Sequence, residues 1–299
     1  MPVTIGTMHI PQCQPVSFLS TDQLQLKGLL FGNAEAVSAY IVIHGLTGSA
    51  FSQHETVVPL ANERTQVLTF SNRGHDKIAY FKRTDPNSEK GYVSEKIGEA
   101  HEVFTECIHD IQGAITFLEE RGVQAIHLVG HSTGCHKAMY YLSQKPSKSV
   151  KGAVLLCPLS DYAYFRYSLD EAIMSNAITI AQKMVGAGKP HELLPLDIWP
   201  GLEDAQRFLS LATPDSEEEI FTYAQPDKEP ETLQKVTVSL NIILAEQDEA
   251  RDRPITEIGE WFKTVLPEEQ IKVSIIPGAT HNLIGKGEEV REGIKLYIP

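Results

Sequence analysis

The sequence lacks the features that mark a membrane-spanning or secreted protein. No run of about 18 apolar residues occurs anywhere, so we expect no transmembrane helix. Residues 1–5 contain neither a basic segment nor the start of a long apolar one, so we expect no secretory signal peptide. The four cysteines form no CxxC pair, which favours reduced thiols in a cytoplasmic protein over a disulfide framework. We expect Cys13, Cys107 and Cys157 to act as small buried hydrophobic residues.

Basic residues are also scarce. The 299-residue chain carries 26 Lys and Arg against 39 Asp and Glu, which gives a net charge of −13. Such a surface repels nucleic acid and anionic membranes, so we expect neither as a partner. No cluster of His, Asp and Glu shows metal-ligand spacing along the chain, so we expect no metal and no cofactor.

What the sequence does contain is an alternation of short apolar runs and helical periodicity. The runs are rich in β-branched and aliphatic residues and do not alternate with polar ones, which is typical of strands buried on both faces of a parallel sheet. They lie at 39–43, 67–70, 126–129, 153–157, 239–244 and 273–276. Helices are expected at 51–63, 102–121, 135–144, 255–265 and 283–297, and an antiparallel hairpin at 16–31. The pattern predicts an α/β fold with a mostly parallel central sheet and helices on both faces.

Two segments interrupt this alternation. Residues 158–232 contain patterns for helices at 170–185, 203–211 and 216–223, and are too long for a structureless loop. We therefore divide the chain into a core, residues 1–157 and 233–299, and a helical lid insertion, residues 158–232. A shorter polar insertion spans residues 76–100.

The strongest chemical signal is Gly-His-Ser-Thr-Gly at 130–134. It follows the strand at 126–129 and precedes the helix at 135–144, which is the strand–turn–helix context of a G-x-S-x-G nucleophile elbow. The flanking glycines let the strand and helix approach, and the serine lies at a helix N-terminus that favours negative charge. We assign Ser132 as the nucleophile.

A serine on such an elbow is followed along the chain by an acid and then by a histidine base. His281 lies in a loop just after the last predicted strand, and we assign it as the general base. The acid is expected after the strand at 239–244, in a loop with several carboxylates. Asp248 is our choice, because its short side chain can point back to the imidazole and hold its tautomer. The alternatives left open are Glu246, Glu249 and Asp252.

Acyl transfer also needs donors for the oxyanion. The backbone N–H of Thr133, the residue after the nucleophile, is one candidate. The second is the N–H of Leu46, in the His-Gly-Leu-Thr-Gly loop at 44–48 that follows the first core strand.

These motifs, in this order, resemble the α/β-hydrolase superfamily over nearly the whole chain. More narrowly, Ser-Asn-Arg-Gly-His at 71–75, the elbow with Cys135, and Tyr-Tyr-Leu at 140–142 are similar to a branch related to fungal siderophore esterases. That resemblance implies hydrolysis of an ester in a sizeable polar substrate. Helical lids of this fold sometimes make dimer contacts, so a homodimer is one option.

The lid begins with an aromatic stretch that could line an acyl or aryl pocket. We assign Tyr162, Tyr164, Phe165 and Arg166 to substrate binding, together with His131 beside the nucleophile. The alternative for the rings is that they pack the lid onto the body.

The sequence therefore predicts a carboxylic-ester hydrolase that acts on a small molecule through an acyl-enzyme. A thioesterase, an amidase or a C–C bond hydrolase would use the same triad. A low-turnover ligand-binding receptor of the same fold is the alternative from another class.

Overall fold

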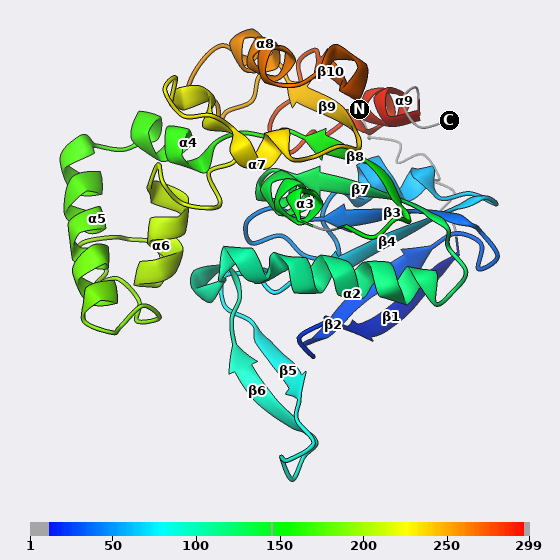
Figure 1. The fold of residues 1–299 in the computed structure, drawn as a ribbon, viewed down its shortest axis with the longest axis horizontal. Helices are drawn as coiled ribbons and strands as arrows, with labels where there is room; N and C mark the ends of the chain where they lie inside the picture. Colours follow the sequence, from blue (N-terminus) through cyan, green and yellow to red (C-terminus); the bar gives the residue numbers. More distant parts are fainter. Residues whose placement is uncertain (1–11, 145, 296–299) are drawn as a thin grey trace, which may run out of the picture.

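The computed structural model describes residues 12–144 and 146–295 of the chain (Figure 1). Its centre is an eight-stranded sheet in the order β1-β2-β4-β3-β7-β8-β9-β10. The strands are β1 (Cys13–Leu19), β2 (Gln25–Phe31), β3 (Ser38–Ile43), β4 (Thr65–Ser71), β7 (Ala125–His131), β8 (Val150–Leu156), β9 (Ser239–Ala245) and β10 (Ile271–Ile276). β1 and β2 pair antiparallel, as does β2 with β4, and all other pairings are parallel. The predicted hairpin and all six predicted runs are confirmed as strands.

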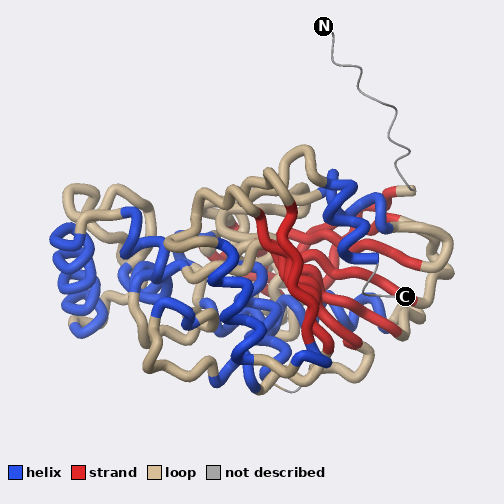
Figure 2. Tube along the Cα trace, turned by 90° about the horizontal axis from the view of Figure 1, so that it is seen from above, coloured by secondary structure: helices blue, strands red, loops and turns tan. Residues whose placement is uncertain are grey.

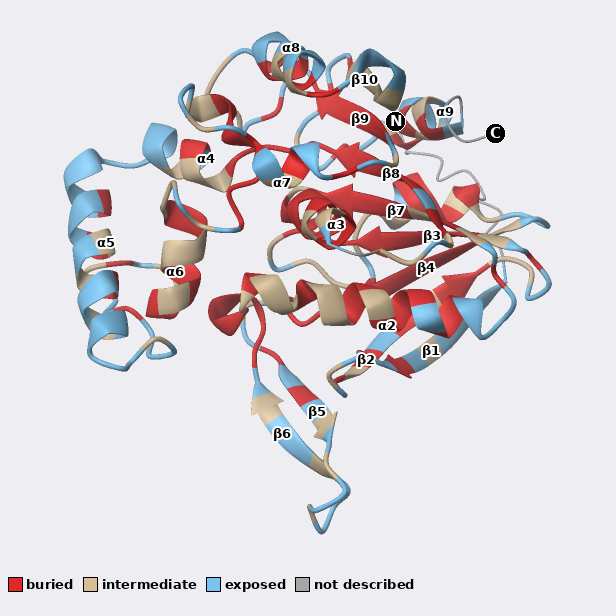
Figure 3. Ribbon diagram, viewed as in Figure 1, coloured by how far each residue is buried: buried red, intermediate tan, exposed pale blue. Residues whose placement is uncertain are grey.

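Helices cover both faces of this sheet. They are α1 (His54–Val57), α2 (Cys107–Glu119), α3 (Thr133–Ser143), α8 (Ile255–Val265) and α9 (Gly287–Lys295). One face packs on α2, α3 and α8, and the other packs on α1 and α9. Successive strand residues alternate between the two faces, so that Ile41 joins the first cluster and Val42 the second. Both faces are therefore apolar, which explains the continuous apolar runs in the sequence (Figure 3).

Four predicted helices differ from those observed. The helix expected at 102–121 begins at Cys107, after a 3₁₀ turn at Phe104–Glu106. The helix expected at 51–63 is a single turn, α1, followed by a 3₁₀ turn at Val58–Leu60 that contains Pro59. The helix expected from residue 283 begins at Gly287, because Leu283 and Gly285 adopt positive φ angles of 56° and 71°. Residues 296 and 297 of that prediction lie outside the described residues. The helix expected at 216–223 is absent, and only a 3₁₀ turn forms at Thr222–Ala224.

Residues 158–232, which we call the cap segment, leave the sheet after β8 and return before β9. They contain α4 (Asp161–Ser168), α5 (Glu171–Gly186), α6 (Ala205–Ala212) and α7 (Glu231–Gln234). α4, α5 and α6 lie beyond the end of the sheet toward which the parallel strands point (Figures 1 and 2). They share a small apolar cluster of their own that includes Met174, Trp199 and Phe208. Residues 76–100 form the protruding hairpin β5 (Tyr80–Thr84) and β6 (Tyr92–Lys96).

The cysteine predictions are confirmed for two of three residues. All four thiols are free, and Cys107 and Cys157 are buried, whereas Cys13 is exposed on the edge strand β1. Among residues 12–144 and 146–295, no helix is both long and apolar enough to cross a bilayer. The predicted absence of a signal peptide at residues 1–5 lies outside the described residues.

Candidate active site

Ser132 occupies a strained turn between β7 and α3. Its φ is 54° and its ψ is −127°, a conformation that side chains rarely adopt without support from their surroundings. The support requires glycine on both sides. A Cβ on Gly130 would lie 2.6 Å from the Gly134 carbonyl oxygen, and one on Gly134 would lie 2.1 Å from the Ile43 carbonyl oxygen. The G-x-S-x-G pattern is therefore explained by close packing of strand, turn and helix.

His281 and Asp248 complete a continuous hydrogen-bonded chain from the serine. His281 Nε2 lies 2.9 Å from Ser132 Oγ, and His281 Nδ1 lies 3.0 and 2.9 Å from the two carboxylate oxygens of Asp248. Asp248 is fully buried. Because the carboxylate can only accept, Nδ1 carries the proton and Nε2 is left to accept the serine proton. The structure thus brings together three residues that are 33 to 149 positions apart in the sequence.

The other carboxylates of the acidic loop make different contacts. Glu249 Oε2 accepts the backbone N–H of His281 at 2.9 Å, and Glu246 Oε2 accepts the backbone N–H of Gly278 at 2.7 Å. Asp252 pairs with the neighbouring Arg253 at 2.8 Å. Glu246 and Glu249 therefore hold the backbone of the histidine loop, and Asp248 is the acid that meets the imidazole.

The pKa of His281 is raised above the usual value for histidine. Burial alone lowers it, but the hydrogen bond and charge of Asp248, followed by the charge of Glu249, outweigh the burial. The protonated form that arises during proton transfer is stabilised by these two carboxylates.

Two further histidines position the site rather than exchange protons. His131 donates from Nε2 to the backbone carbonyl of His281 at 2.9 Å, and burial lowers its pKa to about 4. His44 donates from Nδ1 to the Gly45 carbonyl and accepts the Asn72 N–H at Nε2, and burial lowers its pKa to about 3. Both rings stay neutral near pH 7 and hold the loops on either side of Ser132. His131, assigned to substrate binding from the sequence, also lines the cavity beside Ser132.

The two expected oxyanion donors flank the serine. Thr133 is the first residue of α3, and Gly45, next to Leu46, packs so closely that a Cβ there would lie 2.8 Å from Ser132 Cβ. In the described part of the chain, no acceptor pairs with the backbone N–H of Leu46 or Thr133. The first N–H groups of a helix have no partner within the helix, which leaves the Thr133 N–H available to a ligand, whereas Leu46 lies in the loop between β3 and α1.

An open cavity of about 670 Å³ surrounds Ser132 and His281. Its volume is in the range of sites that bind small organic ligands. Its lining includes Phe51 and Ile284, which are 72% and 76% exposed. Neither residue is predicted from the sequence, because single apolar residues in loops give no periodic signal. Four of the non-glycine residues with positive φ line this cavity, namely Thr47, Gln53, Ser132 and Leu283.

The aromatic stretch of α4 lies elsewhere. Tyr162, Tyr164, Phe165 and Arg166 are not among the residues that line the cavity around Ser132. The Phe165 ring lies 5.8 Å from that of Trp199 and also packs near Tyr164, within the cap segment. Arg166 donates to the Tyr162 hydroxyl at 3.1 Å. This geometry favours the alternative in which the rings serve packing. The direct contact of these four residues with substrate stays a prediction.

Together, the doubly covered parallel sheet and the elbow at the carboxyl end of β7 define an α/β hydrolase. The chain belongs to the family described as "Protein of unknown function (DUF1749)", whose family model matches residues 101–295. A second model, described as "Alpha/beta hydrolase of unknown function (DUF915)", matches residues 32–151. No curated protein matches the chain in sequence.

Solved structures of esterases share this architecture. The siderophore hydrolase EstB from Aspergillus fumigatus has a TM-score of 0.64 at 16% identity, covering 95% of this chain and 96% of that one. The carboxylesterase CesB (YbfK) from Bacillus subtilis has a TM-score of 0.58 at 19% identity, covering 96% of this chain and 91% of that one. Est1E from Butyrivibrio proteoclasticus, solved with ferulic acid bound, has a TM-score of 0.58 at 18% identity, covering 95% of this chain and 99% of that one. At these identities the likeness establishes the fold.

Proposed function

We propose that this chain is a serine hydrolase that cleaves a carboxylic ester through an acyl-enzyme intermediate. The observation that carries the proposal is the uninterrupted hydrogen-bonded chain from Ser132 through His281 to Asp248. Serine is a weak nucleophile unless a positioned base takes its proton, and this geometry supplies that base.

Each residue then has one task. Ser132 Oγ attacks the ester carbonyl carbon as its proton moves to His281 Nε2, and the carbonyl oxygen becomes an oxyanion that the Leu46 and Thr133 N–H groups stabilise. The alcohol leaves with the proton from His281, and the acyl group stays on Ser132. Water, deprotonated by His281, attacks the acyl carbon and releases the acid.

The substrate class follows from the cavity. Its volume of about 670 Å³, largely polar lining and exposed apolar side chains suit an ester with a sizeable polar part and an apolar group. The names of two similar structures, a siderophore hydrolase and Est1E with bound ferulic acid, support a substrate of that size. Thioester, amide and C–C bond cleavage use the same machinery and are the alternatives that substrate screening distinguishes.

Two further expectations belong to this proposal. The chain divides into a core, residues 1–157 and 233–299, and a cap segment that acts as a lid, since the segment lies beyond the carboxyl ends of the strands. A cytoplasmic location is supported by four free thiols.

The test is steady-state hydrolysis of p-nitrophenyl esters from acetate to decanoate by the wild type and by Ser132→Ala. We expect turnover by the wild type and a loss of at least about 10⁴-fold in the variant. Turnover that survives in Ser132→Ala would refute the assigned nucleophile. If neither protein turns over any ester of the series, the receptor alternative is favoured and the esterase proposal fails.

A further inference from the structure

A second cluster of polar side chains lies near the triad, where the cap segment meets the body. It consists of His136 on α3, Asp161 at the start of α4, and Glu218 after α6. One potential ligand atom from each residue lies within 4.8 Å of the others. His136 and Glu218 are buried, and the side chain of Asp161 is 19% exposed.

The hydrogen bonds of His136 define its tautomer. Its Nε2 lies 2.6 Å from the backbone carbonyl oxygen of Leu159, which can only accept, so Nε2 carries the proton. Nδ1 therefore presents a lone pair, and it has no hydrogen-bond partner. Metal-binding histidines commonly have this arrangement, in which the second ring nitrogen donates to a carbonyl and orients the ring.

The atom facing that lone pair is a carboxyl oxygen of Asp161. Asp161 Oδ2 lies 3.7 Å from His136 Nδ1 and has no hydrogen-bond partner either. A shared proton would draw the two atoms to about 2.7–3.2 Å. Two ligands of one tetrahedral zinc ion, at bonds of about 2.0–2.2 Å, lie about 3.4 Å apart, which is closer to the observed spacing.

The third residue can join without losing its present contacts. Glu218 accepts from Arg207 Nη1 at 2.5 Å and from Ser210 Oγ at 2.7 Å. A carboxylate offers about four lone-pair sites, so Glu218 retains room for a metal ion while these partners orient it. Arg207 itself pairs with three carboxylates, those of Glu99, Glu102 and Glu218, and makes no ion pair with Asp161.

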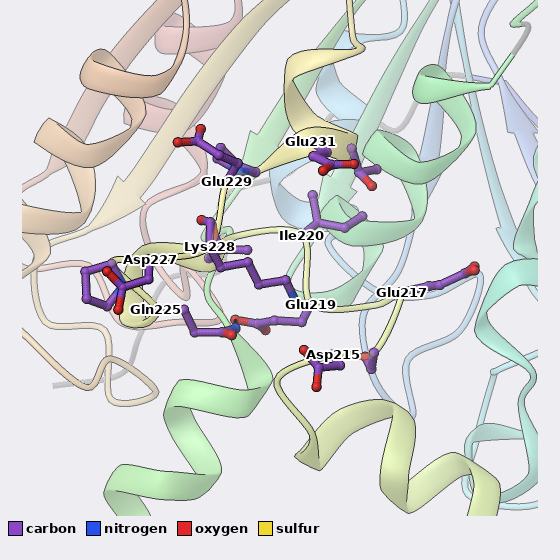
Figure 4. A pocket seen from close by; sticks show the side chains of 14 residues that line it. Asp215, Glu217, Glu219, Ile220, Gln225, Asp227, Lys228, Glu229 and Glu231 are labelled. Atoms are coloured by element: carbon purple, nitrogen blue, oxygen red, sulfur yellow. Dashed lines mark hydrogen bonds between the residues drawn. The ribbon is translucent and has the colours of Figure 1, made fainter.

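An acidic pocket lies beside the segment that carries Glu218. It has a volume of about 760 Å³ and is formed by residues 215–232 (Figure 4). Six carboxylates and one lysine line it: Asp215, Glu217, Glu219, Asp227, Glu229, Glu231 and Lys228. Glu219 accepts from Ser160 Oγ at 2.8 Å, so the pocket wall reaches the neighbour of Asp161. The surplus of negative charge attracts cations to this pocket.

We propose that His136, Asp161 and Glu218 bind one divalent metal ion, of the class that imidazole and carboxylate ligands prefer, zinc above all. The ion would join α3 of the body to two parts of the cap segment and fix their relative position. The three residues are 25 and 57 positions apart in the sequence, so ligand spacing along the chain gave no sign of them.

Metal content measured directly tests the proposal without reference to hydrolysis. Protein stripped with a chelator is dialysed against Zn²⁺ and analysed for bound metal, and Co²⁺ serves as a spectroscopic probe of the coordination. The variants are His136→Gln, which keeps a donor for Leu159, and Asp161→Asn in the partly exposed first turn of α4. The control is His109→Gln on α2, a partly exposed histidine whose Nδ1 lies 2.7 Å from Thr21 Oγ1.

We expect the wild type and His109→Gln to retain one equivalent of zinc and to melt at a higher temperature with zinc than without. His136→Gln and Asp161→Asn should lose at least about tenfold in affinity and show no zinc-dependent rise in melting temperature. If His136→Gln does not fold, Asp161→Asn decides alone.

Failure of the wild type to bind zinc, or equal binding by both variants, would overturn the proposal. Cys157, Asp248 and His281 form another cluster of potential ligands. His281→Ala is therefore included, and zinc lost in that variant but retained in Asp161→Asn would equally refute the site.

Discussion

The body and the cap segment bury different kinds of side chain. The sheet is enclosed by two extensive clusters of aliphatic and aromatic residues, one on each face. The cap segment has a small apolar cluster of its own around α5 and α6, and α6 meets the body through buried charges. Leu159, Ile220 and Phe221 of the cap segment join the apolar cluster of the body. Arg207 of α6 pairs with Glu102 and Glu99 of the body at 3.5 and 3.9 Å, and Lys77 of the body pairs with Glu203 of the cap segment.

This difference separates the catalytic residues, which lie in the body, from the cap segment beside them. Apolar burial depends little on pH or bound ions, whereas buried ion pairs stabilise only while every partner is present and charged. All three members of the triad come from the body, and the cavity around Ser132 is lined by body residues. We therefore expect changes in the cap segment to affect stability and changes in the body loops to affect turnover.

The largest effect is expected from Asp248→Asn. The amide can leave the imidazole in the wrong tautomer, so kcat should fall by about 10⁴-fold while the fold is retained. Steady-state kinetics with a p-nitrophenyl ester and a melting curve measure the two quantities. The matched control is Glu249→Gln, which keeps an oxygen acceptor for the His281 N–H and should lose less than about tenfold in kcat. Equal losses in the two variants would mean that Asp248 is not the orienting acid.

The triad could be predicted from the sequence because it follows from chain order on a recognisable fold. Ser132 has a local motif, and His281 follows the last core strand. The choice of Asp248 over Glu249 was open, because both lie in the same loop and only the geometry shows which one meets the imidazole.

The buried charges could not be predicted in the same way. Arg207 and Lys137 are fully buried, but in a sequence a charged residue reads as solvent-exposed. Their burial depends on partners such as Glu102 and Glu218, which come from different elements of the fold. The predicted contact of the α4 aromatic residues with substrate rested on their distance along the chain from β8, which does not report the direction in which α4 leaves the sheet.

The next largest effect is expected from Arg207→Ala. The substitution leaves Glu99, Glu102 and Glu218 buried without this cation, at a cost of about 3–5 kcal/mol in the free energy of unfolding. Urea unfolding measures the loss, and limited proteolysis should reveal new cleavage within residues 158–232. The control is Lys189→Ala, which removes an exposed pair with Glu192 and should cost less than about 1 kcal/mol. Equal stabilities of the two variants would show that the interface does not depend on its charges.

A smaller effect is expected at the exposed apolar residues that line the cavity. Removing the apolar side chain of Phe51 or Ile284 should lower kcat/KM for the decanoate ester by about tenfold, or 1.4 kcal/mol, with little change for acetate. Tyr162→Ala serves as the comparison, because that ring lies outside the cavity and should change neither value by more than about twofold. A selective loss in Tyr162→Ala instead would support the predicted role of the α4 aromatic residues and a cap segment that closes over the substrate.

The smallest effect concerns pH. Only neutral His281 can accept the serine proton, and its pKa is raised, so kcat/KM should fall with decreasing pH at a midpoint above about 6.5. His44 and His131, with pKa values lowered to about 3 and about 4, do not titrate in that range, whereas Asp161, whose pKa burial raises to about 7, titrates there and its charge acts on His281. Glu249→Gln removes one charge that raises the pKa of His281 and should move the midpoint downward.

The same raised pKa fixes the sign of its effect on stability. The native state holds the His281 proton more tightly than the unfolded chain does. The contribution of His281 to the free energy of unfolding is therefore fully present below its pKa in the unfolded chain, and it is lost as pH rises through its pKa in the folded protein. Turnover and this part of the stability should therefore change in opposite directions over one pH interval. Urea unfolding of the wild type and of His281→Ala across pH 5 to 9 measures the difference. A midpoint for kcat/KM below 6.5, or a His281 contribution that grows with pH, would contradict the assigned electrostatics of the triad.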